Sequence, residues 1–189
     1  MSPRATVLVE PLPNDALSRI AEIDRSETVR TLYTQRGTEL VPRAVNEEVP
    51  DFFAEGESHS IPSLVAEWQP DLDAGGVLIG AFVDGALAGI AMLGIEVEEA
   101  VPQLALLFVS RPHRRMGVAD ALLDEIEHLA RERGARALYV SAVPSDSAVG
   151  FYASRGFRPV EPLPGPFAKE PEDVHMLLAF GHDRRDARA

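Results

Sequence analysis

The spacing of apolar residues predicts a strand followed by a helix at the start of the chain. Residues 6–10 have the composition of a short strand, and Asn14 is a residue type that caps helices. The apolar positions at helical spacing after it are Leu17, Ile20, Ala21 and Ile23. This pattern continues loosely to residue 33, so we expect one helix there.

Residues 36–60 show little periodicity. They contain six acidic and two basic residues, so we expect a long acidic connection that forms a solvated face. A short helix is predicted at residues 63–68, and Pro70 is expected to end it.

The spacing of apolar residues changes at residue 77, and from there it predicts strands. Apolar runs at 77–83 and 86–93 are separated by Asp84-Gly85, a dipeptide typical of two-residue hairpin turns. An acidic turn at 96–99 precedes the nearly continuous apolar run 104–109, which is typical of a strand buried on both faces. We therefore expect an antiparallel hairpin beside a central strand.

An amphipathic helix is predicted after the central strand, with Gly134 as its C-terminal stop. Its apolar positions are Ala119, Leu122, Leu123, Ile126, Leu129 and Ala130. Residues 137–143 are predicted as another buried strand, and 145–154 as a shorter helix that ends at Gly156. The order strand, helix, strand, helix predicts a parallel pair in the middle of a mixed sheet.

Two closing antiparallel strands are predicted at 157–159 and 174–180, joined by a stiff loop with five prolines. Residues 181–189 have the composition of a flexible polar tail. A length of 189 residues favours one domain, which we place at residues 1–180. The fold class is α/β: a mixed, mostly antiparallel and twisted sheet, splayed at its central parallel pair, with helices on both faces.

Composition narrows the possible functions. The formal net charge of −12 disfavours nucleic acid and anionic membranes as main partners. The chain has no cysteine, and its five histidines lack metal-ligand spacing, so we expect neither a disulfide nor a metal site. We find no signal peptide and no uncharged run near the roughly 20 residues of a membrane span, which predicts a cytoplasmic protein.

One segment has the features of a pyrophosphate-binding loop. It consists of Arg114, Arg115, Met116, Gly117, Val118 and Ala119, between the central strand and the start of the long helix. A helix start offers unpaired backbone N–H groups and positive potential, and a glycine lets a ligand approach the backbone closely. The segment lacks the lysine and hydroxyl of a P-loop and the full GxGxxG of a dinucleotide fold.

This segment resembles the first signature of the GCN5-related N-acetyltransferase (GNAT) superfamily. That signature is Gln or Arg, two residues, Gly, one residue, then Gly or Ala, and residues 114–119 match every defined position. Residues 148–157, Ala-Val-Gly-Phe-Tyr-Ala-Ser-Arg-Gly-Phe, resemble the second signature. The resemblance is closest over residues 77–160.

The resemblance implies acetyl-CoA as acyl donor and direct transfer to an amine in a ternary complex. The pantetheine arm of acetyl-CoA would meet Leu107, Phe108 and Val109, and its pyrophosphate the backbone from Arg115 to Asp120. Tyr152 occupies the position of the tyrosine that protonates the departing thiolate. A phenol with a pKa near 10 is protonated at neutral pH and suits this role.

Three residues depart from the family pattern. Gln103 stands where many relatives have a glutamate that serves as general base, and an amide cannot take that proton. Ser145 replaces an asparagine that contacts the cofactor arm, and the carboxylate of Asp120 would repel pyrophosphate unless it points away. The base is therefore unassigned; the candidates are Glu27, Glu96 and Glu98.

The predicted acceptor is a primary amine of a small molecule, and the acidic stretch 36–60 would favour a cationic one. Acetylation of a protein N-terminus or lysine, transfer of a longer acyl group, and a non-catalytic acyl-CoA-binding regulatory module stay open as alternatives. We expect a monomer or homodimer.

Overall fold

The computed structural model describes residues 6–52 and 60–181. Its elements in chain order are β1 (Val7–Leu12), the 3₁₀ helix η1 (Asn14–Glu22), β2 (Glu27–Arg36), β3 (Glu39–Val49), α1 (Ile61–Asp73), β4 (Val77–Val83), β5 (Ala86–Glu98), β6 (Val101–Val109), the 3₁₀ helix η2 (Arg111–His113), α2 (Val118–Glu132), β7 (Ala137–Ala142), α3 (Asp146–Ser154), β8 (Arg158–Pro159), α4 (Pro164–Lys169) and β9 (Val174–Ala179). Most of the predicted polar tail, residues 182–189, lies outside the described residues.

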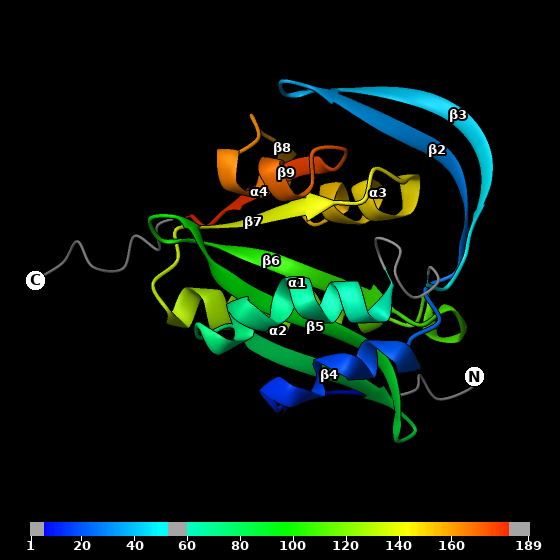
Figure 1. Cartoon of the computed structure of the whole chain (residues 1–189), viewed down its shortest axis with the longest axis vertical. Helices are drawn as coiled ribbons and strands as arrows, with labels where there is room; N and C mark the ends of the chain where they lie inside the picture. The colour runs from blue at the N-terminus through cyan, green and yellow to red at the C-terminus, as the bar shows by residue number, and fades with distance from the viewer. Residues whose placement is uncertain (1–5, 53–59, 182–189) are drawn as a thin grey trace, which may run out of the picture.

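A seven-stranded mixed sheet organises the fold, in the order β1-β4-β5-β6-β7-β9-β8 (Figure 1). Its pairings are antiparallel except that of β6 with β7, which confirms the predicted central parallel pair. The predicted hairpin is also confirmed: Asp84 and Gly85 both have positive φ, 50° and 81°, as a tight two-residue turn requires.

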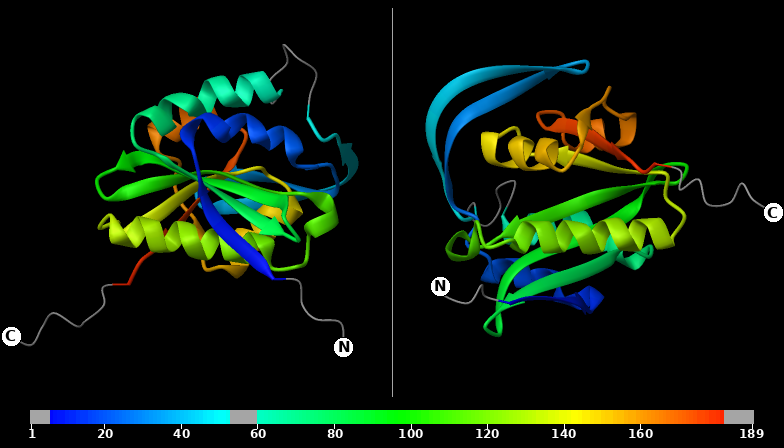
Figure 2. Two further views of the ribbon diagram at one scale, coloured as in Figure 1. Left: turned by 90° about the horizontal axis from the view of Figure 1, so that it is seen from below. Right: turned by 180° about the vertical axis from the view of Figure 1, so that it is seen from behind.

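Helices cover both faces of the sheet, as predicted (Figure 2). On one face, α2 and α3 pack against alternate side chains of the strands, such as Ala91 and Leu93 of β5. On the other face, α1 and η1 pack against the intervening residues, such as Ile90 and Met92. The nearly continuous apolar character of β5 follows from this burial on two sides.

The region from residue 27 to 49 contradicts the prediction. Strands β2 and β3 form a separate two-stranded antiparallel sheet, here called the arm, instead of a continued helix and an acidic connection. The arm curves around α3 (Figure 2). Most of its side chains are exposed or half-buried on both faces, so it lacks the alternation of apolar and polar residues by which a half-buried strand is recognised.

Three smaller predictions are also wrong. Asn14 begins a 3₁₀ helix and does not cap an α-helix; its side-chain Nδ2 donates to Leu72 O at 3.2 Å. Pro70 lies inside α1, which continues to Asp73. The proline-rich loop contains the short helix α4, because prolines at 164 and 166 fall in its first turn, where no intrahelical N–H bond is lost.

The side chain of Gln35, near the tip of the arm, forms hydrogen bonds with β9 and with the segment that follows β8. Gln35 Nε2 donates to Val160 O at 2.7 Å, and Gln35 Oε1 accepts from His175 N at 2.7 Å. Nearer the base of the arm, Tyr33 N donates to Pro144 O at 2.8 Å. These bonds hold the arm over the ends of β7 and β9.

We expect Gln35→Ala to lower the free energy of unfolding by about 1 to 3 kcal/mol, because it removes the partners of two part-buried main-chain groups. The exposed neighbour provides the matched control: Arg36→Ala should change stability by less than about 0.5 kcal/mol. Denaturant unfolding of both variants measures the difference. Equal stabilities would show that Gln35 does not anchor the arm.

Candidate functional site

The two central strands part soon after they pair (Figure 1). Within the described residues, the β6–β7 ladder has two pairs, Gln103 with Tyr139 and Leu104 with Val140, although β6 continues to Val109. At the same point the β5–β6 register shifts, since Met92 pairs with Leu106 and Leu93 with Leu104. Ala105 is therefore the extra residue of a β-bulge, a feature that re-aims backbone groups next to active sites.

The predicted pyrophosphate loop lies where β6 ends and α2 begins. Arg115 and Gly117 have positive φ, 64° and 85°, and α2 has no side-chain cap at its N-terminus. A Cβ added at Gly117 would meet nothing within 4 Å, so the backbone is open to a ligand. Open N–H donors at a helix start fit a pyrophosphate.

Neighbouring segments hold this loop in place. Arg114 Nε donates to Val109 O at 3.3 Å, and Arg111 N donates to Asp24 O at 2.7 Å. Ser110 Oγ accepts from Asp24 N at 3.1 Å. Before the loop, Leu107, Phe108 and Val109 are half-buried along the part of β6 that no longer pairs with β7.

The remaining predicted loop contacts differ in exposure. Met116 is 39% exposed, and Ala119 is half-buried at the start of α2. Val118 is buried in the core, so only its backbone is available to a ligand.

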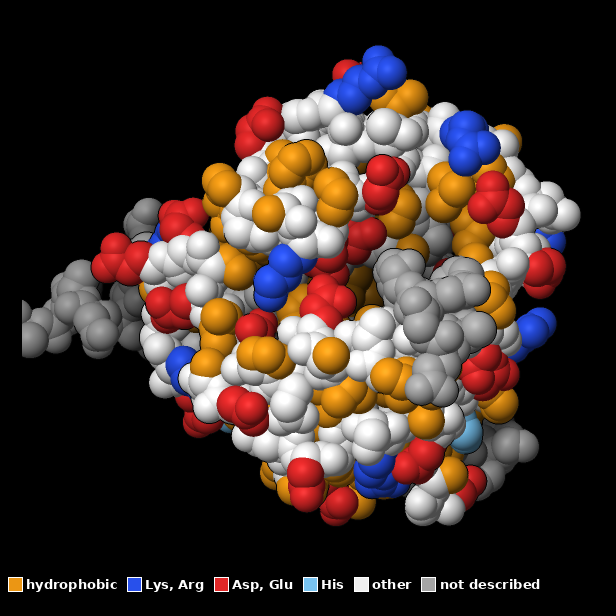
Figure 3. Space-filling model, viewed as in Figure 1, with side chains coloured by type: hydrophobic (Ala, Val, Ile, Leu, Met, Phe, Trp, Pro, Cys, Tyr) orange, Lys and Arg blue, Asp and Glu red, His pale blue; other side chains and the backbone are white. Residues whose placement is uncertain are grey.

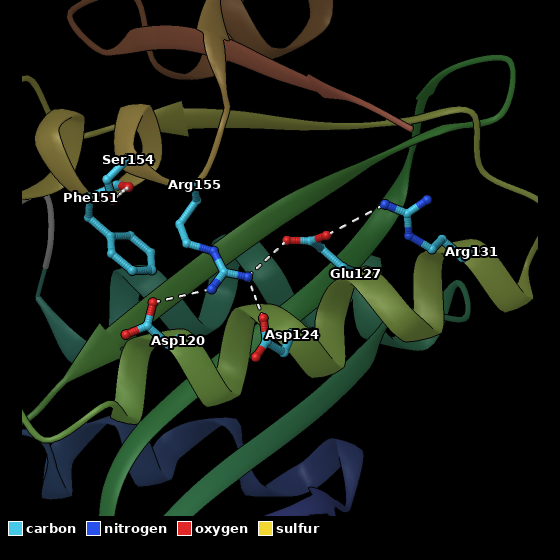
Figure 4. A network of polar contacts seen from close by, with 7 residues as sticks. All are labelled: Asp120, Asp124, Glu127, Arg131, Phe151, Ser154 and Arg155. Atoms are coloured by element: carbon cyan, nitrogen blue, oxygen red, sulfur yellow. Dashed lines mark hydrogen bonds and ion pairs between the residues drawn. The ribbon is translucent and has the colours of Figure 1, made fainter. Parts of the chain in front are cut away.

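Asp120 does not point at the loop but toward α3 (Figure 4). Its Oδ1 lies 3.3 Å from Arg155 Nη1, and Asp124 and Glu127 of the same helix also bind this guanidinium, Glu127 at 3.3 Å. Because Asp120 points toward Arg155, which offsets part of its charge, the repulsion of a pyrophosphate is reduced. Sequence reasoning missed Arg155, although acids at 120, 124 and 127 share one face of the predicted helix.

Ser145 caps α3. Its Oγ accepts from Ala148 N at 3.3 Å and lies 3.0 Å from Ser147 Oγ, and the residue is 1% exposed. The hydroxyl is thus engaged in the cap.

Tyr152 lies on α3 and is 6% exposed. Its ring packs edge-on against Phe151 and Phe157, with ring centroids 5.3 Å apart in both pairs. Burial, and to a lesser extent the charge of Asp173, raise the pKa of Tyr152 above its ordinary value. The phenol is therefore protonated at neutral pH, as a proton donor must be.

A carboxylate pair lies on the opposite side of the central strands, between α4 and β9. Burial is the main cause that raises the pKa of Glu170 to about 7, and it also raises the pKa of Asp173 to about 6. Gln103 Nε2 of β6 donates to Glu170 Oε2 at 3.5 Å. Figure 3 shows acidic side chains around a hollow on this face.

Sequence reasoning missed this carboxylate pair. The only signal was the run Glu170-Pro171-Glu172-Asp173 in the predicted proline-rich loop.

The three candidate bases named from the sequence lie elsewhere. Glu27 Oε2 accepts from Ser147 Oγ at 2.7 Å on the arm, and Glu98 pairs with Arg136. Glu96 lines a pocket with Arg133, just beyond the C-terminal end of α2. At 1.5 Å per residue that end is about 22 Å from the pyrophosphate loop. Glu96 and Glu98 lie opposite Pro102 and Val101 in the β5–β6 ladder, before the point where β6 and β7 part.

A cavity of about 350 Å³ lies between the arm and the segment that joins α4 to β9. Its lining includes Tyr33, Arg43, Pro144, Asp173 and His175. Pro144 follows the end of β7, so one wall of the cavity lies next to the C-terminal end of that strand. It is large enough for a small molecule.

The described residues bear on two expectations from the sequence, that the chain has no membrane span and no metal site. Among the residues that the structure describes, no helix combines the length and apolar character that a bilayer span requires. Within the same ranges, no three His, Cys, Asp or Glu side chains are grouped as a metal site would need.

Comparison with known proteins decides the family. A model of the acetyltransferase (GNAT) family matches residues 41–157, more than half of the chain. The chain belongs to this family. The GNAT resemblance, the acyltransferase class and acetyl-CoA as donor are thereby confirmed, whereas the individual contact residues stay predictions.

Solved GNAT structures share the fold. Nourseothricin acetyltransferase is 23% identical, with a TM-score of 0.66 over 92% of this chain and 98% of that chain. A Bacillus anthracis protein assigned as a streptothricin acetyltransferase, solved with acetyl coenzyme A, is 16% identical, with a TM-score of 0.60 over 95% and 100%. PaiA N-acetyltransferase of Thermoplasma acidophilum, solved with coenzyme A, is 16% identical, with a TM-score of 0.61 over 93% and 99%. No curated protein sequence matches the chain significantly.

Two substitutions at Gly117 separate backbone strain from cofactor binding. Both Gly117→Ala and Gly117→Glu place an L-residue at positive φ, so each should lose about 1 to 2 kcal/mol of stability. Gly117→Glu also adds a long side chain and a negative charge to the loop, so it should lose thermal stabilisation by acetyl-CoA, whereas Gly117→Ala, which adds one methyl group, should lose only part of it. Normal acetyl-CoA binding by Gly117→Glu would contradict the placement of the pyrophosphate.

Proposed function

We propose that this GNAT protein transfers an acetyl group from acetyl-CoA to a primary amine of a small cationic molecule, with Tyr152 as the general acid. The observation that carries the proposal is the cavity beneath the arm, next to the end of β7, whose lining holds two carboxylates, Glu172 and Asp173, against one guanidinium, Arg43. Carboxylates in a partly enclosed cavity favour a cation over a neutral or anionic acceptor.

The proposed donor site uses the loop and the unpaired part of β6. The backbone of residues 115–120 would bind the pyrophosphate, and Leu107, Phe108 and Val109 would line the pantetheine arm. Acetyl-CoA supplies an activated thioester carbonyl. The bulge at Ala105 supports this arrangement, because it turns backbone groups of β6 out of the ladder with β5.

The acceptor and the proton donor lie on facing sides of the proposed site. Asp173 is in the cavity lining, and its charge acts on the pKa of Tyr152, so the two groups lie close enough to interact. Tyr152 holds its proton until a thiolate departs and then donates it. Holding amine and thioester together contributes much of the rate enhancement.

The names of two similar structures support a small-molecule acceptor. One is a nourseothricin acetyltransferase, and another is assigned to streptothricin. We extend this only to the chemical class, an amine on a positively charged small molecule. The carboxylates of the cavity are the reason.

The function is tested with purified protein, acetyl-CoA and a panel of acceptors. The panel contains a linear diamine, an aminoglycoside, an amino acid and a peptide with a free N-terminus, and release of free thiol is measured. Cationic small molecules should give the highest kcat/KM. Highest activity with the peptide would instead favour protein acetylation, and acetyl-CoA binding without thiol release from any amine would favour a non-catalytic module.

We expect Tyr152→Phe to lower kcat by about 10²-fold or more, because the variant cannot protonate the thiolate. Its acetyl-CoA affinity should stay close to that of the unmodified protein, since the change removes one hydroxyl. Thiol-release kinetics measure the first quantity and thermal-shift titration the second. Unchanged turnover would contradict the assignment of the acid.

A further inference from the structure

We infer that Glu170 is the general base that removes the proton of the acceptor ammonium. This inference rests on the proposed function. It assigns the base to the segment after α4, where sequence reasoning had placed only a stiff loop.

The contact with Gln103 places the Glu170 carboxylate at the point where the strands part. Gln103 is 3% exposed and belongs to the first of the two residue pairs that join β6 to β7. Its Nε2 donates to Glu170 Oε2 at 3.5 Å. An amide at this position cannot accept a proton from an ammonium, but it can orient a carboxylate that does.

A buried hydrogen-bond network fixes the backbone that carries Glu170. His175 is 1% exposed, its Nε2 lies 3.2 Å from Glu170 O, and its Nδ1 lies 2.8 Å from the Tyr139 hydroxyl. A carbonyl only accepts, so Nε2 carries the proton and Nδ1 accepts from Tyr139. The Tyr139 oxygen in turn accepts from Leu163 N at 3.1 Å, just before α4. His175 is thus a positioning residue.

The charges around Glu170 come from several elements and explain its protonation behaviour. Burial is the largest cause of its pKa of about 7, and the charges of Asp173 and of Glu67 on α1 raise it further. A hydrogen bond with Ser141 on β7 and the charge of Lys169 act in the opposite direction. A base with a pKa near the working pH is both partly ionised and able to take a proton.

Asp173 has a different task in this arrangement. It lines the cavity, whereas Glu170 contacts the central strand. In our proposal Asp173 binds the cation in the cavity, and Glu170, beside the cavity lining and in contact with Gln103, receives the proton directly or through one water.

The proton balance is complete without another reactant. An N–H bond of the ammonium breaks, and its proton moves to the Glu170 carboxylate, directly or through one water. The freed lone pair forms the bond to the acyl carbon, the carbon–sulfur bond breaks, and the sulfur takes a proton from Tyr152. After the amide loses its second N–H proton to restore Tyr152, Glu170 releases its proton to solvent.

The test compares Glu170→Gln with Glu161→Gln, an exposed carboxylate on the connection between β8 and α4. Glu170→Gln should lower kcat/KM by about 10²- to 10⁴-fold. It should also abolish the rise of kcat/KM with pH that has its midpoint near 7 in the unmodified protein. Glu161→Gln should keep both the rate and the pH profile.

Two further variants separate a base from a structural role. Exchanging the two side chains, Gln103→Glu with Glu170→Gln, returns a carboxylate to the other end of the 3.5 Å contact and should recover at least tenfold of the lost rate. Asp173→Asn removes a negative charge that raises the pKa of Glu170, so the rise of kcat/KM should move to lower pH.

A measurement without turnover supports the same assignment. The raised pKa makes ionisation of Glu170 more costly in the folded than in the unfolded state. Below about pH 4.5 the carboxyl is protonated in both states, and stability is lost as pH rises from there through about 7. The Tm of Glu170→Gln relative to the unmodified protein should therefore increase between pH 5 and pH 8.

The outcomes distinguish this inference from the proposed function. An active unmodified protein, with Glu170→Gln retaining both its rate and its pH profile, would overturn the base assignment alone. Absence of thiol release with every amine would overturn the proposed function and this inference with it. Failure of the side-chain exchange to recover rate would also count against Glu170 as base.

Discussion

Strands β6 and β7 remain hydrogen-bonded for only two residue pairs, and the candidate site depends on this parting. Backbone N–H and C=O groups inside a protein need partners, and a ligand can supply them where a neighbouring strand is absent. The bulge at Ala105 lies at the same level of the sheet, and the pyrophosphate loop lies at the far end of β6. The donor site that we propose thus follows the length of β6, with the activated carbonyl at the end nearer Gln103.

Charged side chains differ between the two sides of the gap between β6 and β7, in a chain whose formal net charge is −12. On the α2 side, Arg155 binds three carboxylates and turns Asp120 away from the predicted pyrophosphate loop, so the repulsion of an anion at the start of that helix is reduced (Figure 4). On the other side, Glu170 and Asp173 are partly buried, with pKa values above those of free carboxyls. The acidic side therefore suits the cationic acceptor that we propose.

The sequence was most informative where one pattern determined one structure. Local sequence signals determine three features: the burial of β5 and β6 on both faces, the Asp84-Gly85 turn, and the end of α2 at Gly134. Each signal lies within the few residues that form the feature. The arm could not be predicted in this way, because a two-stranded sheet exposed on both faces has no apolar stripe. Its position depends on distant partners such as His175 for Gln35.

The candidate site, too, could be predicted only where its residues are contiguous in the sequence. The predicted pyrophosphate loop is a contiguous motif, residues 114–119, so the sequence alone indicates it. Glu170 acquires its properties from Gln103, Ser141, Glu67 and His175, which come from four other elements. Only the folded chain brings these residues together, so a search for a nearby glutamate pointed to Glu27, Glu96 and Glu98 instead.

A crystal structure of the protein with acetyl-CoA tests the central claim most directly. We expect the pantetheine arm to lie between β6 and β7 beyond Leu104, with the pyrophosphate on the backbone of residues 115–120 and the acetyl group toward Gln103 and Glu170. Acetyl-CoA bound away from the parted strands, or an acetyl group directed away from Glu170, would contradict it.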